Sequence, residues 1–158
     1  MINPRALVDS SISRLQSISG FVAALGGNAT RITAYAEVYP QRASVLQAVQ
    51  TMLPGSALLI WLSSGPGNFG RNEVWQHSFS LILRAPEDAP DAYYDLWRQF
   101  CNGVPAGGNQ NLRNINIHPH VWPMNTPRID RKSMITGEQT SLDYFEITYS
   151  LNERGDSQ

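Results

Sequence analysis

The segment at residues 53–84, LPGSALLIWLSSGPGNFGRNEVWQHSFSLILR, decides the expected fold. It contains two runs typical of β-strands, residues 57–62 and residues 74–84, which flank a polar stretch rich in Gly and Asn. This arrangement predicts an antiparallel pair of strands that carries a projecting loop. The first run is apolar at every position, which is typical of a central strand covered on both faces. The second run alternates apolar and polar residues, which predicts a strand with one buried face.

The chain before this segment is expected to begin with a long helix. Apolar residues recur every three or four positions from residue 5 to residue 25, and Gly26-Gly27-Asn28 follows as a stop signal. Gly20 lies inside this helix and weakens the prediction that the helix is continuous. Residues 29–40 alternate in polarity and predict either a strand or an extended arm, which Pro40 ends.

The remaining segments are expected to complete one domain. They predict a short helix at residues 45–53, a helix at 92–102, strands at 112–121, 129–135 and 142–151, and a polar tail at 152–158. Trp122 and the prolines beside it predict an irregular crossing segment, since two prolines do not fit a central strand. The order of elements therefore predicts a single α+β domain at residues 1–151, with a mostly antiparallel sheet and helices packed on one face.

The composition limits the classes of function. The chain has 158 residues, which is enough for one domain with its own core. Charged residues make up 16% and the net charge is −1, so there is no basic excess to attract a nucleic-acid backbone. The single cysteine, Cys101, excludes an internal disulfide and is expected to be a buried thiol. No signal peptide or membrane-spanning run is recognisable, and we expect a soluble protein made in a reducing cytoplasm.

His118-Pro119-His120 is the cluster that most resembles a metal ligand set. On a strand, residues two apart face the same side, so both imidazoles could bind one ion. The spacing indicates no third ligand, although folding could bring Asp130 or Glu146 close. Packing and backbone hydrogen bonding are the simpler explanation, and we expect no metal or cofactor. His77 lies on the apolar side of its strand, which predicts a buried histidine with satisfied hydrogen bonds.

No pattern for nucleophilic catalysis is recognisable. Ser63-Ser64-Gly65 lacks the residues of a nucleophile elbow, and Cys101 falls on an apolar helix face. Glu87, Asp88 and Asp91 lie in an expected surface turn, where carboxylates cap helices and favour solubility. We therefore expect that the chain is not an enzyme.

The loop at residues 65–73 is the expected contact site. Its glycines suggest a phosphate-binding loop, but it lacks the Lys and Ser/Thr of a P-loop and precedes a strand instead of a helix. Phe and Arg are common at the centres of protein interfaces. A hairpin loop exposed to solvent without a partner is the alternative. The residues expected to contact a partner are Asn68, Phe69, Arg71 and Asn72.

Several segments together form a family pattern. They are EVYP at residues 37–40, LPGS at 53–56, SGPGNFGRNEVW at 64–75 with the strand end at 79–84, SLDYFEI at 141–147 and LNERGD at 151–156. This pattern resembles the tail terminator (tail-completion) proteins of long, flexible-tailed bacteriophages. The likeness extends over residues 37–156 and rests on the overall pattern instead of one diagnostic motif.

The resemblance implies a homo-hexameric ring that caps the tail tube, stops polymerisation of the tail tube protein and offers a docking surface to head–tail connector or neck proteins. Genomic DNA would pass through the lumen without specific binding, and the protein would belong to the virion after assembly in the host cytoplasm. The family has no catalytic residue and no cofactor, and no membrane is implied. In a ring each patch meets a different patch of the neighbour, so the helix at 5–25 and the strand edges are the expected contacts.

Two alternatives stay open. A different neck component, such as a head-closure or adaptor ring protein, has a similar size and a similar α+β make-up. A small metal-dependent binding or hydrolytic domain centred on His118 and His120 belongs to another class of protein. Stoichiometric metal in the purified protein would favour this second alternative.

Overall fold

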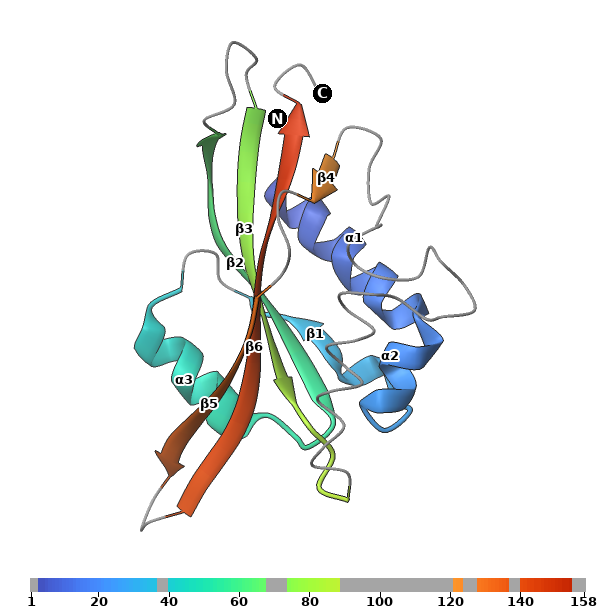
Figure 1. Cartoon of the computed structure of the whole chain (residues 1–158), viewed down its shortest axis with the longest axis vertical. Coiled ribbons are helices and arrows are strands. Elements are labelled where there is room, and N and C mark those ends of the chain that lie inside the picture. Colours follow the sequence, from blue (N-terminus) through green and yellow to red (C-terminus); the bar gives the residue numbers. More distant parts are fainter. Residues whose placement is uncertain are drawn as a thin grey trace.

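The chain folds around one strongly twisted sheet with helices on both sides (Figure 1). The computed structural model describes residues 3–36, 40–67, 74–88, 121–123, 128–136 and 140–154. The predicted single α+β domain with a mostly antiparallel sheet is confirmed. The described elements are α1 (Pro4–Ser17), α2 (Ser19–Ala24), the 3-10 turn η1 (Ala29–Arg31), β1 (Ile32–Ala34), α3 (Arg42–Thr51), β2 (Ser56–Gly67), β3 (Val74–Arg84), β4 (Val121–Pro123), β5 (Arg128–Thr136) and β6 (Thr140–Arg154).

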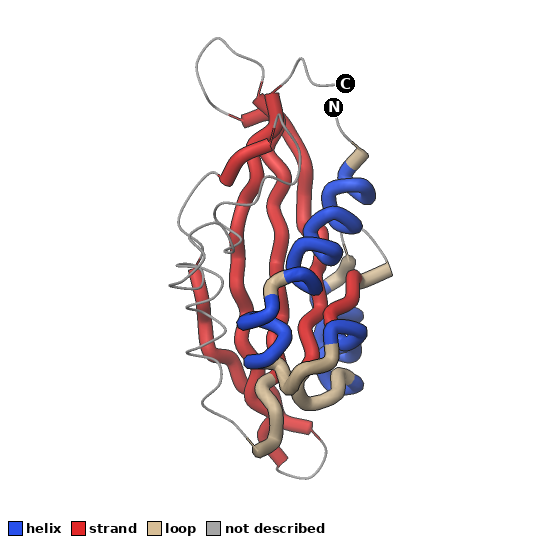
Figure 2. The backbone as a smooth tube through the Cα atoms, turned by 90° about the vertical axis from the view of Figure 1, so that its right-hand side faces the viewer, coloured by secondary structure: helices blue, strands red, loops and turns tan. Residues whose placement is uncertain are grey.

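The six strands form one sheet in the order β1-β2-β3-β6-β4, and β5 also pairs with β6. β1 runs parallel to β2, and the other described pairs are antiparallel. One side of β6 pairs with β3, while its other side pairs first with β5 and then with β4. The strands form one long layer beside which α1 and α2 lie (Figure 2). β6 therefore joins the β2–β3 hairpin to the rest of the sheet.

Alternate residues of the central strands enter two separate apolar cores. Leu59, Phe79 and Ile147 belong to the core under α1 and α2, and Leu58 and Ile82 belong to the core under α3. The predicted coverage of β2 on both faces is confirmed, because Leu58 and Leu59 are 8% and 0% exposed although they point to opposite faces. Thus α1 and α2 share one face, whereas α3 lies on the opposite face. The expectation that the helices pack on one face is therefore wrong for α3, because the apolar residues of the opposite face also need cover.

The first helical segment is interrupted at Ile18, although the sequence predicted one helix over residues 5–25. Ile18 has an extended backbone with φ −85° and ψ 100°, which ends α1 and lets α2 begin in a new direction. Ile18 and Phe21 are each 1% exposed, so the change of direction brings both side chains into the core. The predicted weak point, Gly20, lies inside α2, two residues beyond the actual break.

The turn between α3 and β2 is held by hydrogen bonds from two arginines. Arg31 donates from Nη1 to the Pro54 carbonyl at 2.6 Å, and Arg84 donates from Nη1 to the Met52 carbonyl. The N–H of Gly55 donates to the Arg84 carbonyl at 2.8 Å. Carbonyls at the end of a helix lack partners within the helix, so these arginines stabilise the end of α3 and the start of β2.

Two strands continue beyond the ends that the sequence predicted. β2 runs to Gly67, so the residues from 63 to 67 pair with β3 where the start of the loop 65–73 was expected. β6 runs to Arg154, and Asn152 and Glu153 are 3% and 0% exposed although they were expected in a polar tail. Backbone pairing satisfies N–H and C=O groups whatever the side chains are, so polar composition alone did not mark these strand ends. The domain extends past residue 151.

The last third of the chain is described in part. β5 matches the strand expected at residues 129–135, with one residue added at each end. β4 corrects the expected irregular crossing at Trp122, because Val121–Pro123 pairs with β6 at an edge of the sheet, where proline is tolerated. The helix expected at residues 92–102, with Cys101 and Asp91, lies outside the described residues, and so does the strand expected at 112–121 except for Val121, which belongs to β4.

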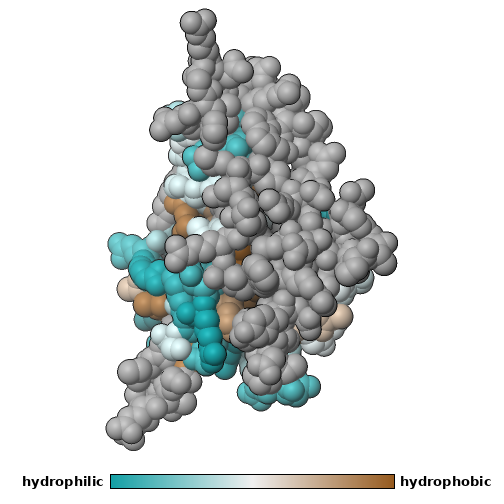
Figure 3. Space-filling view, viewed as in Figure 1, coloured by the Kyte–Doolittle hydropathy of each residue, from teal (hydrophilic) through white to brown (hydrophobic). Residues whose placement is uncertain are grey.

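The β5–β6 hairpin carries charged and polar pairs on its surface. Hydrophilic residues gather over the region of α3 and β5 on the face seen in Figure 3. Arg131 and Ser133 donate to the two carboxylate oxygens of Asp143 at 2.8 and 2.6 Å. These hydrogen bonds, first from Ser133 and then from Arg131, hold the pKa of Asp143 below its ordinary value of 3.8.

Replacing Asp143 with asparagine is expected to cost no more than about 1 kcal/mol at neutral pH, because the ion pair with Arg131 is exposed. Folding lowers the pKa of Asp143, so its carboxylate stabilises the fold above pH 3.8, and this contribution is lost as the pH falls through the lower folded pKa. Urea unfolding across this range should show the wild type losing its advantage over the variant. A difference that stays constant into strong acid would contradict this prediction.

Candidate functional site

The β2–β3 hairpin presents the loop that the sequence singled out as a contact site. The two strands pair up to Gly67 opposite Val74, so the hairpin is a regular ladder where the loop departs. The loop of residues 68–73 thus begins and ends at one paired position of the ladder, Gly67 opposite Val74. The predicted contact residues Asn68, Phe69, Arg71 and Asn72 lie outside the described residues.

A bulge in β2 decides which side chains meet near the base of this hairpin. The register between β2 and β3 shifts between Trp61 and Ser63, because Leu62 is an extra residue in the ladder. In a regular strand Trp61 and Ser64 would face opposite sides, since side chains alternate. The extra residue brings both to the face that packs against α1, and Trp61 Nε1 donates to Ser64 Oγ at 2.9 Å.

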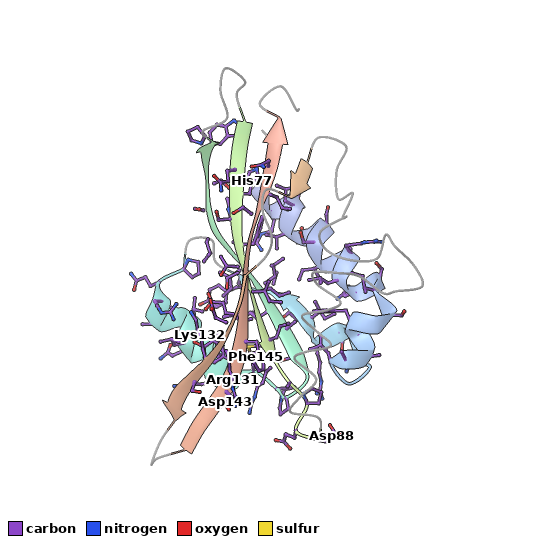
Figure 4. The ribbon with its side chains drawn as sticks, viewed as in Figure 1. His77, Asp88, Arg131, Lys132, Asp143 and Phe145 are labelled. Atoms are coloured by element: carbon purple, nitrogen blue, oxygen red, sulfur yellow. The ribbon has the colours of Figure 1, made fainter. Side chains whose placement is uncertain are left out.

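His77, which is labelled in Figure 4, connects this bulged strand to β6 through a buried hydrogen-bond chain. Its Nδ1 lies 2.5 Å from Ser64 Oγ, and its Nε2 lies 2.7 Å from Oε2 of Glu153. His77 and Glu153 are each 0% exposed, and Ser64 is half-buried. The prediction of a buried histidine with satisfied hydrogen bonds is therefore confirmed, and its partners come from the two strands on either side of β3.

With Glu153 ionised and His77 neutral, the donors and acceptors give the hydrogen-bond chain one direction. An indole nitrogen only donates, so Ser64 Oγ accepts from Trp61. An ionised carboxylate only accepts, so Nε2 of His77 carries the hydrogen toward Glu153. In the neutral imidazole Nδ1 is then the acceptor, and Ser64 donates its hydroxyl hydrogen to it. Each hydrogen bond in the chain therefore has one donor and one acceptor.

No sequence pattern indicates the two partners of His77. Ser64 lies in no nucleophile elbow, and Glu153 follows the end of the strand predicted at residues 142–151. The two partners are 13 and 76 residues away from His77 along the chain, so no local motif can connect them. The one usable signal was His77 itself, because a histidine on an apolar strand face needs partners on the neighbouring strands.

This arrangement has two chemical capacities. It ties β2, β3 and β6 together below the loop, because each of the three strands supplies one polar side chain. It also polarises the Ser64 hydroxyl, since a basic nitrogen accepts its hydrogen and a buried carboxylate orients the imidazole.

The described residues contain no group of three or more His, Cys, Asp or Glu side chains that could hold a metal ion. Glu146, considered as a third ligand, accepts from Ser80 at 2.9 Å and pairs with Lys132 at 2.5 Å. His118 and His120 lie outside the described residues. Among the helices that the structure describes, none is long and apolar enough to cross a membrane.

No protein-family model matches the sequence, and no curated protein is significantly similar to it. The function is therefore inferred from the sequence pattern and from the geometry of the described residues.

Proposed function

We propose that this chain is a structural subunit of a long-tailed phage virion, and that it assembles into a closed, hexameric ring at the junction of tail and neck. The ring caps the tail tube, ends polymerisation of the tube protein and offers a docking surface to the head connector. The sequence pattern quoted above suggested this role, and the shape of the sheet supports it. Genomic DNA passes through the lumen without specific binding, in keeping with the net charge of −1.

The observation that carries the proposal is that, among the described strands, the sheet has an edge without a pairing partner on each of two opposite sides. β1 pairs with β2 only as far as Leu59, so from Ile60 to Gly67 no other described strand covers the outer side of β2. On the far side of the sheet, β5 pairs only with β6 among the described strands. Ring closure needs two different patches on each subunit, and two unlike edges meet this need. Unpaired edges also favour association with another chain.

The hairpin supports the second half of the proposal, which concerns the tube or the next ring. Beyond the bulge at Leu62, β2 and β3 pair regularly up to the base of the loop, and the buried bonds of His77 fix this base to β6. The strands that support the loop are ordered before any partner binds. Binding therefore costs little further conformational entropy in these strands, which favours affinity. The loop at residues 68–73 is therefore the proposed contact with the tube or the next ring.

The assembly test measures mass by light scattering after size exclusion, with negative-stain images of the same fraction and of the fraction mixed with tail tubes. The expected result is a discrete ring of about six subunits, or a smaller species that caps tube ends as a ring. Open-ended polymers would instead identify a tube protein. A monomer that leaves tube ends uncapped would overturn the proposal, and rings that bind only connector complexes would identify another neck component.

Deleting residues 68–71 from the loop is expected to abolish tube capping while the ring still forms, because the free edges lie outside the loop. The matched control changes Glu87 and Asp88 to alanine, since both are exposed in the turn at the opposite end of β3 (Figure 4). Tail length and head–tail joining are measured in a complementation assay. Normal tails with the deletion would show that the loop is not the contact.

A further inference from the structure

The hydrogen-bond chain of Ser64, His77 and Glu153 matches the arrangement that activates a serine for attack. A nucleophile lies within hydrogen-bond reach of a base, and a third group orients that base. We propose that Ser64 is an activated nucleophile that accepts an acyl group from a carboxylic ester, with His77 as the general base and Glu153 as the orienting carboxylate. This activity goes beyond the proposed structural role and differs from the sequence-based expectation of a protein without catalysis.

The polarity of the chain favours proton transfer from Ser64. Nε2–H of His77 donates to Glu153, which leaves the lone pair of Nδ1 directed at the serine hydroxyl. The imidazole becomes a cation when it takes the proton, and the buried carboxylate 2.7 Å away stabilises that charge. Low local polarity strengthens this stabilisation, because His77 and Glu153 have no exposed surface. Either ring nitrogen can act as the base once the other is held by a carboxylate.

A purely structural tie would not need these residue types. The surrounding face of the sheet is apolar and includes Phe79, Leu81 and Leu151. Replacing buried polar groups by apolar residues of similar size is often neutral or stabilising, so a buried His–Glu pair contributes little net stability.

Part of the Ser64 residue is exposed to solvent. It is half-buried, its neighbour Ser63 is exposed, and no described strand covers β2 beyond Leu59 on the outer side. A hydroxyl oxygen has two lone pairs. Trp61 Nε1–H occupies one of them at 2.9 Å, and the other stays available for attack on a carbonyl carbon.

The proposed reaction balances without a cofactor. Ser64 Oγ forms a bond to the carbonyl carbon of the ester while its proton passes to Nδ1 of His77. The bond from that carbon to the alkoxide oxygen breaks, and the alkoxide leaves with the proton from Nδ1. Water then gives its proton to Nδ1 and bonds to the acyl carbon, and Ser64 leaves with that proton. The products are one alcohol and one carboxylic acid.

The test treats the purified full chain with a fluorophosphonate probe, from which an activated serine displaces fluoride. Mass spectrometry of the digested protein then locates the label. We expect a label on Ser64, none on this position in Ser64→Ala, and wild-type labelling in Ser63→Ala, the adjacent exposed serine. Glu153→Gln and His77→Gln are expected to slow labelling of Ser64 by about 100-fold, the order of magnitude of general-base assistance.

Several outcomes would overturn the proposal. They are an unlabelled Ser64 in the native wild type, labelling that favours Ser63, or an unchanged rate at Ser64 in a folded Glu153→Gln or His77→Gln variant. If one of these two variants does not fold, the labelling rates of Ser64 in the other variant and in the wild type test the proposal. The probe reaction is read at Ser64 by mass spectrometry and the ring by light scattering of the untreated wild type, so the acyl-transfer proposal and the ring proposal fail or stand separately.

Discussion

Replacing His77 with alanine is expected to lower the free energy of unfolding by about 3–5 kcal/mol, the usual cost of removing one partner from a buried pair. The imidazole has no solvent exposure and bonds to Ser64 on one side and to Glu153 on the other. Without it, the Glu153 carboxylate loses its imidazole donor while it stays inside the fold. Urea unfolding followed by circular dichroism measures the loss as a shift of the midpoint at constant slope.

A double-mutant cycle shows whether this loss comes from the pair itself. Glu153→Ala removes the carboxylate, and the variant with both changes no longer has an unpaired group from this contact. We expect the double variant to be more stable than the sum of the two single losses predicts, by about 0.5–3 kcal/mol. Ser63→Ala is the control and should stay within about 0.5 kcal/mol of the wild type, as exposed positions usually do. A loss below about 1 kcal/mol for His77→Ala would contradict the prediction, because it would mean that Glu153 keeps its stability in the fold without its imidazole partner.

The strands could be predicted where side-chain alternation follows burial. β3 begins and ends as the sequence indicated, because its apolar residues alternate toward the core under α1. β2 was predicted too short, since Ser63, Gly65 and Pro66 resemble a loop although their backbone pairs with β3. The period of apolar side chains shows which face of a strand is buried. It does not show whether the polar end of a strand still forms backbone hydrogen bonds with the neighbouring strand.

The helices show a similar division. The apolar spacing identified α1 and α3 as helical regions, but the break at Ile18 depends on where the core lies and not on a local stop signal. The position of α3 on the opposite face depends on tertiary packing, since α1 and α2 do not cover Leu58, Ile60 and Ile82. Local helix propensity does not predict which face of the sheet a helix covers.

Of the three residues of the candidate site, one could be predicted from the sequence. His77 was recognised as buried, whereas Ser64 reaches it only because the bulge at Leu62 changes the face of the strand. Glu153 reaches it because β6 continues past residue 151. A bulge and a strand extension are both set by pairing between distant segments, so neither has a local sequence signature.

Replacing Gly55 with alanine is expected to cost about 3 kcal/mol, the sum of a left-handed backbone penalty of ~1–2 kcal/mol and an overpacking penalty of ~1–3 kcal/mol. Gly55 has φ +71°, and a Cβ at this position would overlap the carbonyl oxygen of Leu25, which belongs to the backbone and cannot rotate away. The turn itself cannot move freely, because Gly55 N–H bonds to the Arg84 carbonyl and Arg31 holds the Pro54 carbonyl.

Gly27→Ala is the matched control for this loss, since Gly27 has φ +91° and a Cβ there would meet no atom within 4 Å. It should cost only the backbone penalty of ~1–2 kcal/mol. The difference between the two variants in urea unfolding therefore isolates the steric conflict between Gly55 and Leu25. Equal losses would mean that α2 and the α3–β2 turn separate easily, and that the close approach at Gly55 does not hold the helical layer to the start of β2.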